Sequence, residues 1–207
     1  MGFLTSLAAA ILDPSRENMN RFKGEKGEAQ AALGLLLCLP SEYTVVNNLL
    51  LPMPQGTTQI DHVVVSNYGV FVIESKNISG TIYGSAEDKY WTVCRGPSKF
   101  RLYNPLRQNA THIRALAGAT GLPVRFFHSL VFFWSDNCRF KTPIPSNVLQ
   151  TGLCGYIKSH RRFLLSSEDV RMAIHAIEET KLATTRANAE AHIASLNKMI
   201  CDLDSRV

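Results

Sequence analysis

Residues 57–77, TTQIDHVVVSNYGVFVIESKN, constrain the fold more than any other stretch of the chain. Two apolar runs flank the tetrapeptide SNYG at 66–69, a pattern typical of a β-hairpin. Charged side chains interrupt both runs, and a buried hairpin does not hold such groups without a reason. These residues are Asp61 in the first run and Glu74 and Lys76 in the second.

The register of this hairpin decides where the charges lie. A two-residue loop at 67–68 places Asp61 directly opposite Glu74, with Lys76 further along the same face of the second strand. A three-residue loop with a bulge would shift the pairing by one residue and place His62 opposite Glu74. We favour the first register because it gathers all three charges, and it leaves His62 as a hydrogen-bonded core histidine.

Two facing carboxylates repel each other unless a positive charge lies between them. Their oxygens suit a hard divalent cation, Mg²⁺ or Mn²⁺. The Lys76 ammonium cannot bind such a metal, but it can orient or polarise a water molecule beside it. The pattern therefore favours metal-dependent phosphodiester hydrolysis, and the alternative interpretation is a buried ion network with a structural role.

The rest of the chain alternates helical and strand patterns, which predicts a mixed α/β sandwich. Asn104 and Pro105 have the types expected at the start of a helix, and Gly118 or Gly121 is expected to end it. Helices are predicted over 20–37, 104–121 and from 166 onward; strands over 43–51, 80–85, 90–95 and 125–134; and a short strand and turn over 148–157. The strand at 80–85 is expected to pair with the hairpin as its third strand.

The pattern divides the chain into an apolar segment at 1–17, a main domain at 18–165 and a helical extension at 166–207. Ser166 and Asp169 resemble a capping box at the start of this extension. Apolar residues between 189 and 203 then recur at 4-3-4-3 spacing, which is typical of one narrow helical stripe. The stripe packs on the main domain or pairs with a second chain as a weak homodimer.

Four blocks of the sequence, in this order, resemble the nuclease-related domain family, NERD, over residues 22–116. This family is placed within the restriction-endonuclease-like PD-(D/E)XK superfamily, so the resemblance implies a mixed β-sheet flanked by helices and a DNA nuclease that uses Mg²⁺ or Mn²⁺. The blocks are GEKGE at 24–28, residues 57–77, Trp91 and NPLRQNATHI at 104–113.

The resemblance also implies roles for individual residues. Asp61 and Glu74 match the metal-binding carboxylates, and Lys76 matches the lysine that activates water. Glu28 matches an acidic residue of the first helix that approaches the metal, and Gln108 matches a polar residue that faces the site. His112 follows Gln108 by one helical turn and could face the same cleft. The alternative to catalysis is a nucleic-acid-binding or protein-interaction module of the same fold.

A basic and aromatic stretch at 89–107 supplies the candidate contacts to DNA. Cations interleaved with aromatic rings suit phosphates and stacked bases, although Trp91 is expected in the core. The net charge of +5 permits such an anionic partner without requiring it. The candidate nucleic-acid-binding residues are Arg95, Lys99, Arg101 and Arg107.

Five cysteines occur singly, with no C-x-x-C pair, which argues against a disulfide framework and predicts ordinary thiols in a reducing cytoplasm. The apolar start at 1–12 is too short to span a bilayer and lacks a basic leader region. We therefore expect a cytoplasmic protein without stable membrane insertion.

Overall fold

The computed structural model describes residues 32, 34–35 and 37–182. The apolar segment at 1–17, most of the predicted first helix with Glu28, and the apolar stripe at 189–203 lie outside these residues. No helix in the described part of the chain is long and apolar enough to cross a membrane.

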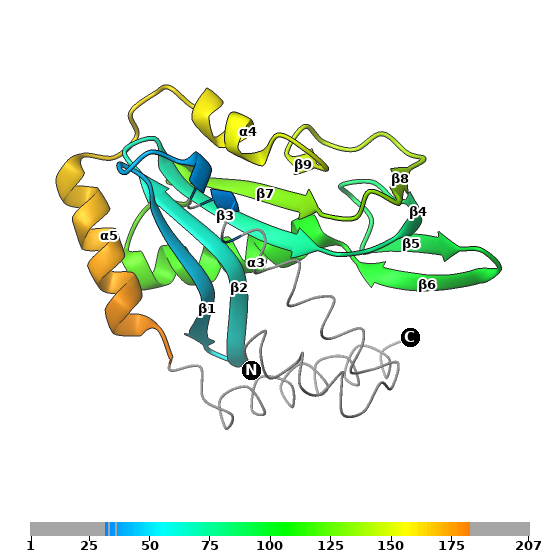
Figure 1. The fold of residues 1–207 in the computed structure, drawn as a ribbon. Helices are drawn as coiled ribbons and strands as arrows, with labels where there is room; N and C mark the ends of the chain where they lie inside the picture. Colours follow the sequence, from blue (N-terminus) through cyan, green and yellow to red (C-terminus); the bar gives the residue numbers. More distant parts are fainter. Residues whose placement is uncertain (1–31, 33, 36, 183–207) are drawn as a thin grey trace, which may run out of the picture.

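The first sheet has five strands in the order β1-β2-β3-β7-β9 (Figure 1). The pairs β1–β2 and β2–β3 are antiparallel, whereas β3–β7 and β7–β9 are parallel. This confirms the predicted mixed sheet. The strands are β1 Thr44–Met53, β2 Gly56–Ser66, β3 Gly69–Lys76, β7 Phe127–Phe133 and β9 Val148–Leu149.

The β2–β3 hairpin has the predicted two-residue loop, because Ser66 pairs with Gly69 and His62 with Ile73. Gly69 has φ 121°, a backbone conformation that residues with a side chain rarely adopt. A Cβ there would come within 2.8 Å of the His128 ring and of the Phe126 carbonyl oxygen. The close approach of β7 therefore requires glycine at this turn.

Helices cover both faces of the first sheet (Figure 1). Helices α3, Pro105–Thr120, and α5, Ser167–Thr180, pack on one face through Ile113, Leu116, Ala173 and Ile177. Helix α4, Leu153–Ser159, and the end of the first helix cover the other face, around Phe71 and Ile73. The architecture is the α/β sandwich expected of a restriction-endonuclease-like domain.

The predicted helix signals at 104–121 and 166–169 are confirmed. Asn104 caps α3 by accepting a hydrogen bond from the Leu106 amide, and Gly121 ends the helix in a left-handed conformation with φ 70°. Ser166 and Asp169 form both hydrogen bonds of a capping box at the start of α5. The segment at 148–157 differs from the prediction, because only two of its residues form a strand and helix α4 follows.

A second sheet, in the order β6-β5-β4-β8, corrects the expectation that the strand at 80–85 pairs with the hairpin. Both edges of β3 are already occupied by β2 and β7, so no edge remains for β4. Trp91 lies fully buried between the two sheets, as predicted. The strands are β4 Gly80–Tyr83, β5 Tyr90–Arg95, β6 Ser98–Tyr103, which the sequence did not predict, and β8 Cys138–Phe140.

A disulfide joins Cys38 to Cys154, so the prediction of ordinary thiols is wrong for these two cysteines. They lie 116 residues apart in the chain, but both border the core on the α4 face, with Cα atoms 6.3 Å apart. The spacing of cysteines along the sequence carries no information on such a long-range contact. Cys94 and Cys138 are free thiols.

His62 on β2 is a fully buried histidine, as predicted. Its Nδ1 donates to Asn47 Oδ1 at 2.8 Å, because an amide oxygen can only accept. Its Nε2 is buried without a hydrogen-bond partner within the described structure. Burial lowers the pKa of His62 to about 4, although the charge of Glu74 opposes this effect.

We predict that His62 makes the fold less stable in acid. Above its ordinary pKa of 6.5 the ring is neutral in both states, and between that value and about 4 only the unfolded chain binds the proton. The free energy of unfolding should therefore fall by about 3 kcal/mol more in wild type than in His62→Gln over this range. Urea unfolding at several pH values measures the difference, and parallel curves for both proteins would contradict it.

Candidate active site

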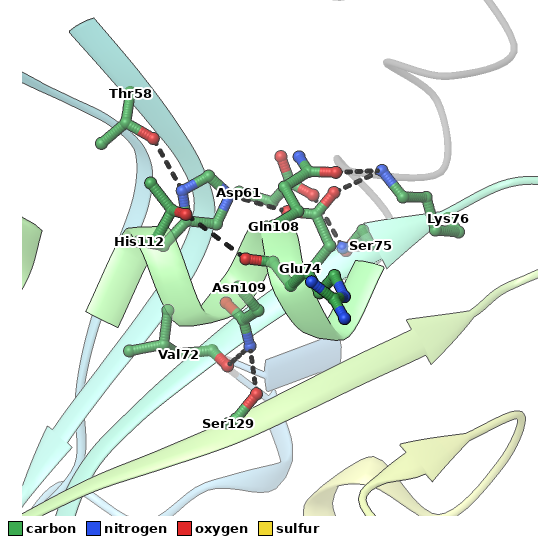
Figure 2. Close-up of polar contacts among 12 residues, drawn as sticks. Thr58, Asp61, Val72, Glu74, Ser75, Lys76, Gln108, Asn109, His112 and Ser129 are labelled. Atoms are coloured by element: carbon green, nitrogen blue, oxygen red, sulfur yellow. Dashed lines mark hydrogen bonds and ion pairs between the residues drawn. The ribbon is translucent and has the colours of Figure 1, made fainter. Parts of the chain in front are cut away.

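Asp61 lies at a break in the first sheet. The ladder between β1 and β2 skips Asp61 and its neighbour Asn48, which has a left-handed φ of 52° that asparagine tolerates better than most residues. The pairing of β2 with β3 also stops short of Asp61. Its Oδ2 instead accepts a hydrogen bond from the Ser75 amide at 2.7 Å (Figure 2). Asp61 is thereby fixed beside the residue that separates Glu74 from Lys76.

The break also changes which side chains of β2 face helix α3. Val63 and Ile60 contribute to the same core, although strict alternation would place them on opposite faces. Thr58 shares the face of Ile60 by alternation and reaches His112 of α3 with its hydroxyl. Thr58 was not predicted as a site residue, because the sequence pattern indicated an unbroken strand.

Glu74 is a carboxylate at the centre of the fold, with 2% of its side chain exposed. Its Oε2 lies 3.0 Å from His112 Nε2, and its Oε1 accepts a hydrogen bond from Lys76 Nζ in an ion pair. Burial raises the pKa of Glu74, but the Lys76 charge and the His112 hydrogen bond outweigh burial and hold the pKa below its usual range. Glu74 is therefore ionised at neutral pH.

Lys76 ends β3 and remains in contact with solvent, since 17% of its side chain is exposed. Its ammonium donates to Gln108 Oε1 at 3.1 Å as well as to Glu74 (Figure 2). Gln108 therefore contacts Lys76, and it holds the ammonium at the surface end of the buried carboxylate.

His112 lies one turn after Gln108 on α3 and is also part of the site. Because the Glu74 carboxylate can only accept, His112 Nε2 carries the proton, and Nδ1 then accepts from the Thr58 hydroxyl at 2.7 Å. The i, i+4 spacing between Gln108 and His112 was the sequence signal that both side chains could face the same cleft. The chain of contacts runs from Thr58 through His112 and Glu74 to Lys76.

Asn109 fixes α3 against the sheet, and no sequence pattern singled it out. Its side chain is fully buried, and its amide donates to the carbonyl oxygens of Val72 and Leu130 at 2.8 and 3.1 Å and to Ser129 Oγ at 2.9 Å. These bonds tie the helix to β3 and β7. They set the height at which His112 meets Glu74 and Gln108 meets Lys76.

The donor set of the site fits a divalent cation in part. Mg²⁺ is often held by one or two carboxylates, with water and substrate phosphate as its other ligands. Asp61 and Glu74 provide two carboxylates from adjacent strands. No group of three or more His, Cys, Asp or Glu residues is arranged to hold a metal within the described ranges, and Glu28, the third predicted ligand, lies outside them.

The predicted nucleic-acid-binding residues do not form one group. Lys99 and Arg101 alternate with the core-facing Leu102 and lie on the exposed face of the second sheet. Arg95 projects from the opposite face of the second sheet, and its Nε donates to the Ser79 carbonyl oxygen at 3.3 Å. The Arg107 guanidinium donates to the carbonyl oxygens of the loop at 87–88.

Comparison with known proteins identifies the family of this chain. The family model for the nuclease-related domain matches residues 23–134, which include every described residue of the site. An uncharacterized protein from Bacillus anthracis is 39% identical over 104 residues, which are 49% of this chain and 48% of that protein. The chain thus spans about half the length of this relative.

No solved structure matches the chain. The family model nevertheless covers more than half of the 207 residues and contains the hairpin, Trp91 and all of α3. The chain belongs to the nuclease-related domain family, NERD.

Proposed function

We propose that this protein is a metal-dependent nuclease that hydrolyses phosphodiester bonds in DNA. The observation that carries the proposal is the Glu74–Lys76 ion pair, which contacts Gln108 and lies beside Asp61. A buried, ionised carboxylate next to a partly exposed ammonium is typical of active sites. Membership of the nuclease-related family supports this reaction class.

In this proposal Asp61 and Glu74 hold a Mg²⁺ or Mn²⁺ ion, together with Glu28. The metal, when bound, supplies positive charge that polarises the phosphate and lowers the pKa of water. Lys76 orients the attacking water and stabilises negative charge on the phosphate through its ammonium. Gln108 keeps the ammonium in place, and His112 with Thr58 fixes the orientation of the Glu74 carboxylate.

A second candidate is a binding module that keeps the site without turnover. Both oxygens of Glu74 already have protein partners, His112 and Lys76, which also suits a structural ion pair. The two functions differ in a simple assay. Cleavage of plasmid and single-stranded DNA by purified protein should require Mn²⁺ or Mg²⁺, stop in EDTA and disappear in Glu74→Gln, which also excludes a contaminating nuclease.

We predict that Lys76→Met and Lys76→Met/Glu74→Gln separate chemistry from stability. The single variant leaves a buried carboxylate without its cation and should lose about 3 kcal/mol of stability at pH 7. The double variant removes this charge and should recover most of the stability. Lys76→Met should cleave DNA on the order of 100-fold more slowly than wild type, because it lacks the ammonium, and the double variant, which also lacks the Glu74 carboxylate, should not cleave it. Normal cleavage by either variant would exclude the role of Lys76.

The pH dependence of these proteins gives an independent test. In wild type the Glu74 pKa lies below 4.5, so its contribution to stability is present above that pH and is lost in acid. Without Lys76, burial should raise the Glu74 pKa, and the single variant should become less stable as the pH rises above 4.5. Denaturant unfolding at pH 5 and pH 7 measures this loss as the difference between the single and the double variant, because both keep His62 and share its contribution over this range.

We predict that Asp61→Asn weakens Mn²⁺ binding on the order of tenfold or more. The asparagine oxygen can still accept from the Ser75 amide, so the local fold is retained while the charge is lost. Calorimetric titration of the full chain with MnCl₂ measures the affinity. Asp136→Asn, at an exposed position, is the matched control. Equal affinities for wild type and Asp61→Asn would remove Asp61 from the metal site.

A further inference from the structure

The second sheet has one face that the core does not use. Its inner face packs Ile82, Trp91, Val93 and Leu102 against β7 and β9. Because strand side chains alternate, the remaining residues of β4, β5, β6 and β8 point to the other side. The nine outward-facing residues are Thr81, Tyr83, Tyr90, Thr92, Cys94, Lys99, Arg101, Tyr103 and Arg139.

The strand register arranges these residues in rows across the sheet. One row joins Lys99, Cys94, Thr81 and Arg139, so the two cations lie at its opposite ends. The next row runs from Arg101 through Thr92 to Tyr83, and a third pairs Tyr103 with Tyr90. None of the nine residues is buried, and none is acidic. The outer face therefore combines cations and aromatic rings without a carboxylate to repel an anion.

The aromatic side chains of this face are presented for contact. Tyr83 is 44% exposed and Tyr103 is 41% exposed, which is unusual for large rings on a folded sheet. The guanidinium of Arg101 lies 4.2 Å from the centre of the Tyr90 ring, which also meets Tyr103 edge to face. Arg101 is thus held flat on the sheet by a cation–π contact, and Tyr83 and Tyr103 keep faces available for stacking.

We infer that this outer face binds single-stranded nucleic acid, with bases stacked on Tyr83 and Tyr103 and phosphates beside Lys99, Arg101 and Arg139. Exposed rings stack only on bases that are not already stacked in a duplex, whereas cations alone would bind both forms. The surface lies on β4, β5, β6 and β8, at the end of the molecule away from α5 (Figure 1). The inference rests on the proposed function, because it names the form of nucleic acid that the nuclease takes.

Only two of the four predicted nucleic-acid-binding residues, Lys99 and Arg101, lie on the outer face. Arg139 joins Lys99 and Arg101 through the β4–β8 pairing, although it lies 38 positions after Arg101 in the chain. Arg95 and Arg107 leave the set, since Arg95 projects from the inner face and Arg107 holds the loop at 87–88.

The test measures binding without cleavage. Fluorescence anisotropy of a labelled 20-nucleotide oligothymidine is followed with the full chain in EDTA, in parallel with the same sequence as a duplex and as an abasic strand. Wild type should bind the single strand at least about tenfold more tightly than either competitor. Tyr83→Ala/Tyr103→Ala should lose about tenfold in affinity for the base-containing strand and should no longer distinguish it from the abasic one.

Matched variants control for folding and charge. Tyr83→Phe/Tyr103→Phe keeps both rings and should bind as wild type does, while unfolding curves verify that each variant is folded. Arg101→Ala/Arg139→Ala should reduce the salt dependence of binding by about 0.7 units of slope for each phosphate that is no longer neutralised. Arg162→Ala/Arg171→Ala removes the same charge from exposed positions outside the second sheet and should leave the slope unchanged.

Three outcomes would overturn the inference: equal affinity of wild type for the base-containing and abasic strands, tighter binding of the duplex, or unchanged binding by folded Tyr83→Ala/Tyr103→Ala. A protein that binds single strands through these tyrosines but cleaves none would leave the inference standing and refute the proposed nuclease. A protein that cleaves through Lys76 but binds independently of the tyrosines would do the reverse.

Discussion

The burial of the Glu74 carboxylate is the constraint on which the arrangement of the site depends. An isolated charge in this position would cost several kcal/mol, and only charged or hydrogen-bonding partners can offset that cost. Those partners come from two elements, Lys76 from β3 itself and His112 from α3. Helix α3 must therefore lie at one height on the sheet, and the three hydrogen bonds of the Asn109 amide hold it there.

The two sheets differ in how far they are covered by the rest of the fold. The first sheet is covered on both faces, so it can keep a carboxylate away from water and hold it with fixed partners. Within the described part of the chain the second sheet is covered on one face only, by the core around Trp91, and its other face carries exposed tyrosines and cations. In our account the chemistry belongs to the first sheet and recognition of the strand to the second.

Local signals in the sequence predicted local structure well. The SNYG turn set the register of the hairpin, and Asn104, Gly121 and the Ser166–Asp169 box marked helix ends, because each acts within a few residues. Contacts between distant segments were not predictable in this way. The Cys38–Cys154 disulfide, the meeting of Thr58 with His112 and the second sheet depend on which strand edges and faces remain free.

The central claim is that Asp61 and Glu74 form a metal site rather than a purely structural ion network. A crystal of the full chain grown with MnCl₂ tests it directly, because manganese gives an anomalous signal that marks its position. The account predicts an anomalous peak in contact with both carboxylates. A peak elsewhere, or none, with Lys76 still paired to Glu74, would contradict it.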